Sequence, residues 1–197
     1  MNSYIIYSIS TLLIIVLGLF SGHFPKNQML QLSKEIKFDF GRGKTGEDWF
    51  IMNDDVMGGL SKGEMDLTPH SLIFSGKISL ENNGGYTFVR CPFGPLGLGN
   101  STKMEIKYRS KGQTIGINLN NSQAWYKPYY KLLLKDTNYK WQEVELELSD
   151  ALEYSRGKPN GKNMQLELVE EIKRLGFSNT ELKEGIFKFE VDYIKFK

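Results

Sequence analysis

Regular alternation of apolar and charged side chains constrains the fold of this chain more than any other sequence feature. Between residues 102 and 109, Met104, Ile106 and Tyr108 alternate with charged neighbours. A two-residue period directs one set of side chains into a core and the other into solvent. The pattern therefore predicts half-buried antiparallel strands, at residues 102–109, 113–120, 130–135 and 143–148.

The last strand is unusually apolar, and its pattern changes phase. Phe187, Phe189, Val191 and Tyr193 share one parity, whereas Ile194 and Phe196 take the other. A strand with one buried face changes parity only at a kink, so we expect a β-bulge near Tyr193 and Ile194. We expect a strand this apolar to pair with a neighbour on each side and not to form the edge of a sheet. We expect it beside an N-terminal strand, which brings the two ends of the domain together.

One short helix is predicted near residue 170. Leu168, Val169, Ile172 and Leu175 recur at helical spacing, and Gly176 stands where a C-terminal cap would lie. A second short turn is expected at residues 149–150. Many short strands separated by Gly, Asn and Pro, with one helix among them, indicate an all-β jelly-roll β-sandwich.

The N-terminus is of a different kind. Residues 4–20 carry no charged side chain, which predicts an apolar helix over residues 1–22. It is either an uncleaved membrane anchor or a cleaved signal peptide. Residues 23–34 form a polar tether, and residues 35–197 form the sandwich domain. We expect association with a membrane through the first segment. The side of the membrane stays open, because lysines after the apolar run favour the cytoplasm whereas an ordinary signal peptide exports the domain.

Composition argues against several classes of function. The chain has 25 Lys and Arg against 23 Asp and Glu, and the basic residues are scattered, so nucleic acid is not an expected partner. Cys91 is the only cysteine, and His70 is the only histidine outside the tether. Transition metals prefer such ligands, and nucleophilic catalysis needs a base of this kind. We therefore expect no catalytic residues, no metal and no cofactor. Calcium takes oxygen ligands, so a structural calcium held by Asn53, Asp54 and Asp55 stays open, with turn capping as the favoured role of these residues.

Two glycine pairs mark the most conspicuous polar segments. Gly58 and Gly59 follow Asn53, Asp54 and Asp55, and a second pair at residues 84–85 follows Asn83, with Arg90 close behind. Such residues build turns, and an Arg90 ion pair with Asp54 or Asp55 would pin two loops together. The same side chains are alternatively a binding site. Candidate binding residues here are Asn53, Asp54, Asp55, Asn83 and Arg90.

Aromatic residues gather around Lys127 and Pro128. Trp125 and Tyr129 are the rings that we select as candidate binding residues. Exposed rings of this kind stack on sugars or anchor a protein partner. The alternative is that they point into the core at the ends of strands.

Several segments form a recognisable combination: Trp49, residues 53–59, Ser61, residues 74–76, residues 81–85, Arg90, Trp141, residues 156–157, residues 175–177 and residues 185–194. Together they resemble the complex I intermediate-associated protein 30 family over about residues 36–196. The resemblance implies a galactose-binding-domain-like β-sandwich and a chaperone-like role in the assembly of respiratory complex I, with no catalytic residues. We therefore expect a non-enzymatic module that binds a protein, such as subunits of a membrane complex. The alternative is a carbohydrate-binding sandwich at the cell surface or in the periplasm.

Overall fold

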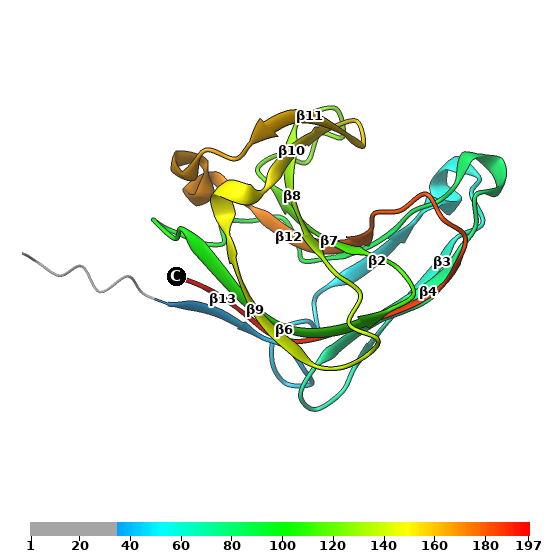
Figure 1. Ribbon diagram of the computed structural model, residues 1–197, viewed down its shortest axis with the longest axis horizontal. Helices are drawn as coiled ribbons and strands as arrows, with labels where there is room; N and C mark the ends of the chain where they lie inside the picture. The colour runs from blue at the N-terminus through cyan, green and yellow to red at the C-terminus, as the bar shows by residue number, and fades with distance from the viewer. Residues whose placement is uncertain (1–34) are drawn as a thin grey trace, which may run out of the picture. The chain divides into compact units, whose positions relative to one another are not determined.

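The described part of the chain is a sandwich of two antiparallel sheets (Figure 1). The computed structural model describes residues 35–197. One sheet has six strands in the order β3-β4-β13-β6-β9, with β1 also paired to β13; the other has seven, in the order β11-β10-β8-β7-β12-β5-β2. The six-stranded sheet contains β1 (Ile36–Asp39), β3 (Lys62–Leu67), β4 (Leu72–Ile78), β6 (Lys103–Lys111), β9 (Gln142–Glu147) and β13 (Gly185–Phe196).

The seven-stranded sheet is curved, with β11 at one edge and β2 at the other (Figure 1). Four short 3₁₀ segments, η1 to η4, connect strands in residues 35–197. The strands are β2 (Phe50–Asn53), β5 (Thr87–Arg90), β7 (Ile115–Asn120), β8 (Tyr129–Leu134), β10 (Leu152–Ser155), β11 (Lys158–Asn163) and β12 (Arg174–Asn179). The 3₁₀ segments are η1 (Asp54–Met57), η2 (Glu81–Asn83), η3 (Leu148–Asp150) and η4 (Leu166–Glu171).

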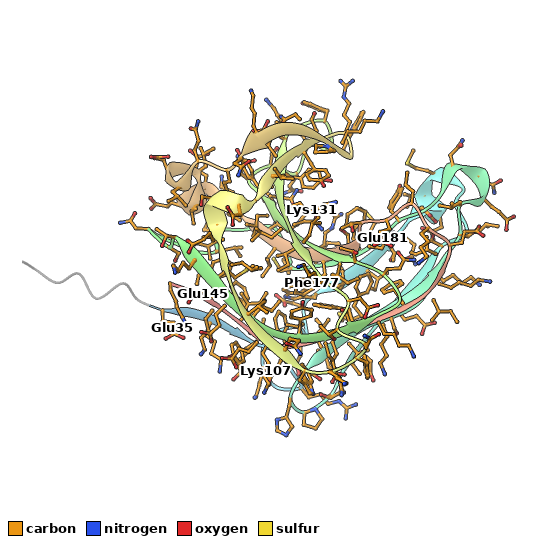
Figure 2. All side chains as sticks on the ribbon, in the orientation of Figure 1. Glu35, Lys107, Lys131, Glu145, Phe177 and Glu181 are labelled. Carbon is orange, nitrogen blue, oxygen red and sulfur yellow. The ribbon has the colours of Figure 1, made fainter. Side chains whose placement is uncertain are left out.

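Aromatic side chains fill the centre of the core. Phe177 on β12 lies 4.8 Å from Phe189 on β13 between ring centroids, which joins the two sheets. Trp49 stacks on Phe177 at 5.5 Å and meets Phe40 edge-on at 5.1 Å. Figure 2 shows Phe177 between the sheets. Aromatic pairs add about 1 kcal/mol each beyond the area that they bury, so this cluster holds the sandwich together.

The strand predictions are confirmed, including the behaviour of the last strand. Met104, Ile106 and Tyr108 are buried on β6. The pairing of β13 with β6 shifts register between Val191 and Tyr193, which is the expected bulge. β13 lies between β4 and β6, and β1 pairs with its C-terminal half, with Ile36 opposite Phe196. The two ends of the domain are therefore neighbours.

The helix prediction is wrong. Only the 3₁₀ segment η4 (Leu166–Glu171) forms, and Gly176 lies inside β12 instead of capping a helix. Val169 and Ile172 are buried as a helical period requires, but the backbone at Ile172 is already extended. Leu175 and Phe177 then alternate with Gly176, so β-pairing with two neighbouring strands prevails over the local period. The short turn expected to begin at residues 149–150 forms as η3, which begins at Leu148 and ends at Asp150.

The predictions for residues 1–22 and 23–34, as an apolar helix and a tether, lie outside the described residues. Within residues 35–197 no helix has the length and hydropathy to cross a membrane.

Candidate functional site

The buried carboxylate of Asp54 organises the conspicuous polar segment. Its Oδ1 accepts the backbone N–H of Ser61 at 2.9 Å, and its Oδ2 accepts those of Gly85 at 2.7 Å and Tyr86 at 3.2 Å. Burial raises the pKa of Asp54, but these hydrogen bonds and the Ser61 hydroxyl outweigh it and lower the pKa below its usual value. We call this arrangement the Asp54 corner. It joins two loops through one side chain.

The glycine pairs follow from the position of this carboxylate. A Cβ atom at Gly59 would lie 2.3 Å from Cγ of Asp54, and one at Gly84 would lie 2.6 Å from Oδ2. Asn53 has a similar role beside the corner, because its Oδ1 accepts the N–H of Gly63 at 2.9 Å and the hydroxyl of Thr87 at 2.6 Å. The Oδ1 atom of Asn53 and the carboxylate of Asp54 thus form hydrogen bonds that hold the fold together.

Asp55 and Asn83 lie at the surface of the corner. The Oδ1 of Asp55 accepts the N–H of Val56 at 2.9 Å, and Asn83 adopts a left-handed conformation with φ of 58°. Both are exposed. The structure brings Asn53, Asp54, Asp55 and Asn83 into one region but directs the first two inward.

Arg90 lies elsewhere. Within residues 35–197 it makes no ion pair with Asp54 or Asp55, so the predicted pin between the loops does not form. Its guanidinium lies over the ring of Phe50, 5.3 Å from the centroid, and donates to Sδ of Met52 at 3.1 Å. Arg90 ends β5 with its neighbour Val89 in the core, so alternation turns Arg90 to the outer side of the seven-stranded sheet.

Large apolar side chains surround the Asp54 corner and remain in solvent. Leu80 and Leu182 both approach Gly85, and the hydroxyl of Tyr86 lies 3.1 Å from Sδ of Met57. Asn82 ties η2 to η1 by donating to the carbonyl of Gly58 at 2.9 Å. Five large apolar residues in this region are between 39% and 82% exposed. We call this set the apolar rim: Val56, Met57, Leu60, Leu80 and Leu182.

The predicted aromatic residues lie at the other edge of the seven-stranded sheet. Trp125, in the loop before β8, is 76% exposed, and the guanidinium of Arg156 lies 5.8 Å from its ring. Tyr129 is half-buried, 5.7 Å from the ring of Tyr154 on β10. Burial raises the pKa of Tyr129 to about 12. Neither ring belongs to the core.

The outer side of the seven-stranded sheet carries polar groups that the sequence analysis did not select. Cross-strand pairing places six residues in one row, running from β2 to β10. Arg174 lies two positions from Gly176 along β12, on the same side. Figure 2 shows Lys131 and Phe177 on opposite sides of this sheet. The row is Phe50, Arg90, Gly176, Asn118, Lys131 and Leu152.

The sequence signal that could have revealed this row is the alternation of inward-facing and outward-facing side chains along each strand. Residues 115–120 and 174–179 show it only weakly, because Gly116 and Gly176 occupy outward positions. Both strands are buried almost throughout. The register between strands, which brings Arg90 and Asn118 to either side of Gly176, is absent from a single sequence.

Groups suited to metal binding or nucleophilic chemistry are scattered. In the described range 35–197, no three His, Cys, Asp or Glu side chains gather to hold a metal ion. Cys91 is buried, and burial raises the pKa of its thiol. The hydroxyl of Ser61 donates to the carbonyl of Ser79 at 3.1 Å. These groups contribute to the fold and form no recognisable catalytic arrangement in that range.

Solved structures show that the domain shares its β-sandwich fold with carbohydrate-binding modules and with part of an agarase. A family 11 carbohydrate-binding module from Clostridium thermocellum, in complex with a β-1,3-1,4-mixed-linked tetrasaccharide, has a TM-score of 0.56 at 18% identity, covering 82% of this chain and 94% of that chain. The family 11 module of cellulase Lic26A-Cel5E of that organism has a TM-score of 0.58 at 18% identity, with 82% and 93% covered. An agarase, AgWH50C, has a TM-score of 0.53 at 17% identity, with 81% and 24% covered. These likenesses show the fold.

The family is shown by the sequence itself. Residues 38–191 match the model of the complex I intermediate-associated protein 30 family, and the chain belongs to that family. No curated protein matches the sequence.

Proposed function

We propose that this protein is a non-enzymatic binding module that docks on subunits of a membrane protein complex during assembly, as its family's name suggests for complex I. The observation that carries the proposal is the apolar rim. Five large apolar side chains remain in solvent around one rigid corner. Exposed apolar clusters on soluble domains typically mark interaction sites.

The construction of the corner supports a docking role. Asp54 fixes η1 from inside, and its three backbone hydrogen bonds hold the two loops in one arrangement. Val56 and Met57, the next residues of η1, are 74% and 76% exposed. A surface that is ordered before binding loses less conformational entropy on association. The family's polar segment therefore supports the surface, and the apolar residues around it contact the partner.

The test is affinity capture from membranes with the full chain in detergent. Wild type is compared with the double variant Val56→Ser, Met57→Ser and with Leu166→Ser as control. Leu166 is an exposed leucine in η4, away from the rim. Since a few central residues carry most of an interface's energy, we expect the double variant to recover subunits of a respiratory or other membrane complex at about one tenth of the wild-type level. Leu166→Ser should match wild type. Equal recovery by all three proteins, or recovery of no membrane-complex subunit, would refute the proposal.

A second function is favoured by a different observation. Trp125, Tyr129 and Tyr154 present ring surfaces at the β8–β10 edge of the seven-stranded sheet, outside the core. Rings of this type stack on sugars. The fold is similar to that of a module whose structure contains a bound tetrasaccharide. We infer carbohydrate binding on this sheet as the second candidate. The test is glycan binding by the double variant Trp125→Ala, Tyr129→Ala, which we expect to be lost. Glycan binding that survives both changes would show that these rings are not the sugar-binding surface.

A further inference from the structure

Positive charge without a counter-ion is concentrated on the outer side of the seven-stranded sheet. The ion pairs formed within residues 35–197 include none of Arg90, Arg174 or Lys131. The outward positions of β2, β5, β7, β8, β10 and β12 hold no carboxylate. We call this surface the cationic face, defined by Arg90, Arg174, Asn118 and Lys131.

The two arginines are close neighbours held on aromatic rings. The guanidinium of Arg174 lies 5.9 Å from the ring centroid of Phe50 and 5.1 Å from that of Phe93, and Arg90 lies over the same Phe50 ring at 5.3 Å. The Nε atoms of both are buried and have no hydrogen-bond partner among the described residues. Burial and the nearby Arg174 charge lower the pKa of Arg90. Two like charges placed together without an anion make a site that an anion stabilises.

Lys131 repeats this arrangement on the other side of Gly176. The residue is only 8% exposed, and its Nζ lies 4.4 Å from the ring centroid of Tyr154 and 5.6 Å from that of Tyr129. The backbone of Lys131 pairs with β7 and β10, but its Nζ has no hydrogen-bond partner within residues 35–197. Burial lowers its pKa to about 8. Buried charges normally have partners, as Asp54 and Glu190 do here. The residue Lys131 is buried as a whole, but its Nζ is not among the fully buried atoms without a partner, so the ammonium is open to an anionic ligand.

Between the cations the face offers hydrogen-bonding groups at the level of the sheet. Asn118 is buried and donates to the hydroxyl of Ser178 at 2.9 Å, but its Oδ1 has no partner in the described range. Gly176 beside it is buried, and a Cβ there would lie 2.7 Å from Cβ of Arg90, so β12 and β5 pack closely at this point of the row. Arg90 and Lys131 are three strands apart, or about 14 Å at the usual strand spacing. A ligand that spans them must be elongated.

We propose that the cationic face binds an acidic oligosaccharide, whose carboxylates pair with Arg90, Arg174 and Lys131 and whose rings lie against Tyr129 and Tyr154. Each part of a uronic acid unit has a corresponding group on the cationic face. Its carboxylate can pair with an arginine guanidinium, its hydroxyls can donate to Oδ1 of Asn118, and its C–H face can pack on a tyrosine ring. An acidic peptide would use the arginines but would leave the ring faces without sugar C–H groups. The inference rests on the second candidate function above and names the sugar class.

The test is calorimetric titration of the full chain in detergent with hexamers of galacturonate, glucuronate and mannuronate. The methyl-esterified galacturonate hexamer, a mixed-linked β-glucan hexamer and hexaglutamate are the comparison ligands. Arg174→Met and Lys131→Met each remove one charge, and Lys62→Met, an exposed lysine on the other sheet, is the control. Thermal melting shows whether each variant is folded, and Arg90→Lys, which keeps the charge, provides a variant with less risk to the fold.

We expect at least one uronate hexamer to bind, with affinity that falls as salt rises. Each charge-removing variant should weaken binding about tenfold, since a charge-assisted hydrogen bond contributes about as much free energy as one decade in affinity. Lys62→Met should bind like wild type. Equal binding of the esterified hexamer, or binding of the β-glucan alone, overturns the acidic class and leaves carbohydrate binding standing. Equal binding of hexaglutamate overturns the saccharide. Binding of no saccharide refutes both the inference and the second candidate function.

Discussion

The Oδ2 atom of Asp54 accepts the backbone N–H of Gly85 at 2.7 Å, across 31 residues of chain. This bond joins the two glycine-pair segments, and the same carboxylate leaves no room for a side chain at Gly59 or Gly84. The carboxylate is buried, so it is directed to the backbone and away from any ligand. The surface that it supports, the apolar rim, is what a partner would meet.

The corner should depend on the charge of Asp54. Asp54→Asn keeps the size but replaces one acceptor with an N–H₂ group facing backbone donors. A buried donor left unsatisfied costs about 2 kcal/mol, so urea unfolding should show a loss of that order. Asp55→Asn, at an exposed neighbour, is the control and should leave the unfolding midpoint unchanged. If the two variants are equally stable, the corner is not the organising contact.

Gly176 should tolerate no side chain. A Cβ there would lie 2.7 Å from Cβ of Arg90 and 2.9 Å from the carbonyl oxygen of Val89. Gly176→Ala should therefore destabilise the domain by about 2 kcal/mol, in the range of overpacked substitutions. Gly94→Ala is the matched control because nothing lies within 4 Å of the Cβ position there. Thermal unfolding of both variants checks the difference, and equal melting temperatures would count against the β12–β5 packing.

Glu190 should be a second sensitive position. It is buried on β13, where Arg109 donates from Nη2 at 2.6 Å, Tyr139 from its hydroxyl at 2.8 Å and Ser71 at 2.7 Å. Glu190→Gln removes the counter-charge of Arg109, so we expect a loss of about 2 kcal/mol in urea unfolding. Glu145→Gln breaks an exposed pair with Lys103 and should cause little change. Equal losses of unfolding free energy in the two variants would contradict the expectation that a buried ion pair stabilises the domain more than an exposed one.

Stability should fall in acid, in part through Glu105. Hydrogen bonds from Lys195 and Lys197 are the main cause of a Glu105 pKa of about 2, against an ordinary value of 4.5. Because the unfolded chain binds the proton more readily, this contribution is complete above the ordinary value and is lost as pH falls toward 2. Urea midpoints measured between about pH 5 and about pH 3 should decrease. Glu105→Gln should flatten that decrease, and an unchanged slope would show that other carboxylates dominate.

Patterns within one segment could be predicted from the sequence. The alternation of Met104, Ile106 and Tyr108 sets which side of β6 is buried, and the parity change after Tyr193 predicts the bulge, because each follows from the geometry of one strand. The helix prediction was wrong for the opposite reason. The spacing of Val169 and Ile172 is compatible with a helix, but pairing with β5 and β7 decides the structure from Arg174 onward.

The candidate site was predicted only in part. Turn chemistry identified Asn53 and Asp54 as builders of a corner, and this is their observed role. The predicted ion pair of Arg90 was wrong, since its contact with Phe50, a ring that it shares with Arg174, arises from the register between β2, β5 and β12. Lys131 and Asn118 were missed for the same reason. Nothing local to either residue indicates that they lie side by side.

The pairing of Ile36 with Phe196 has a practical consequence. The first and last strands of the domain therefore begin and end at the same place. In Figure 1 this place lies at the left of the sandwich, whereas η1 and η2 lie at the right. A tag or surface linkage at either end of the domain would therefore immobilise it in the same orientation. In that orientation the apolar rim remains accessible, so immobilised protein can be used directly to measure partner binding.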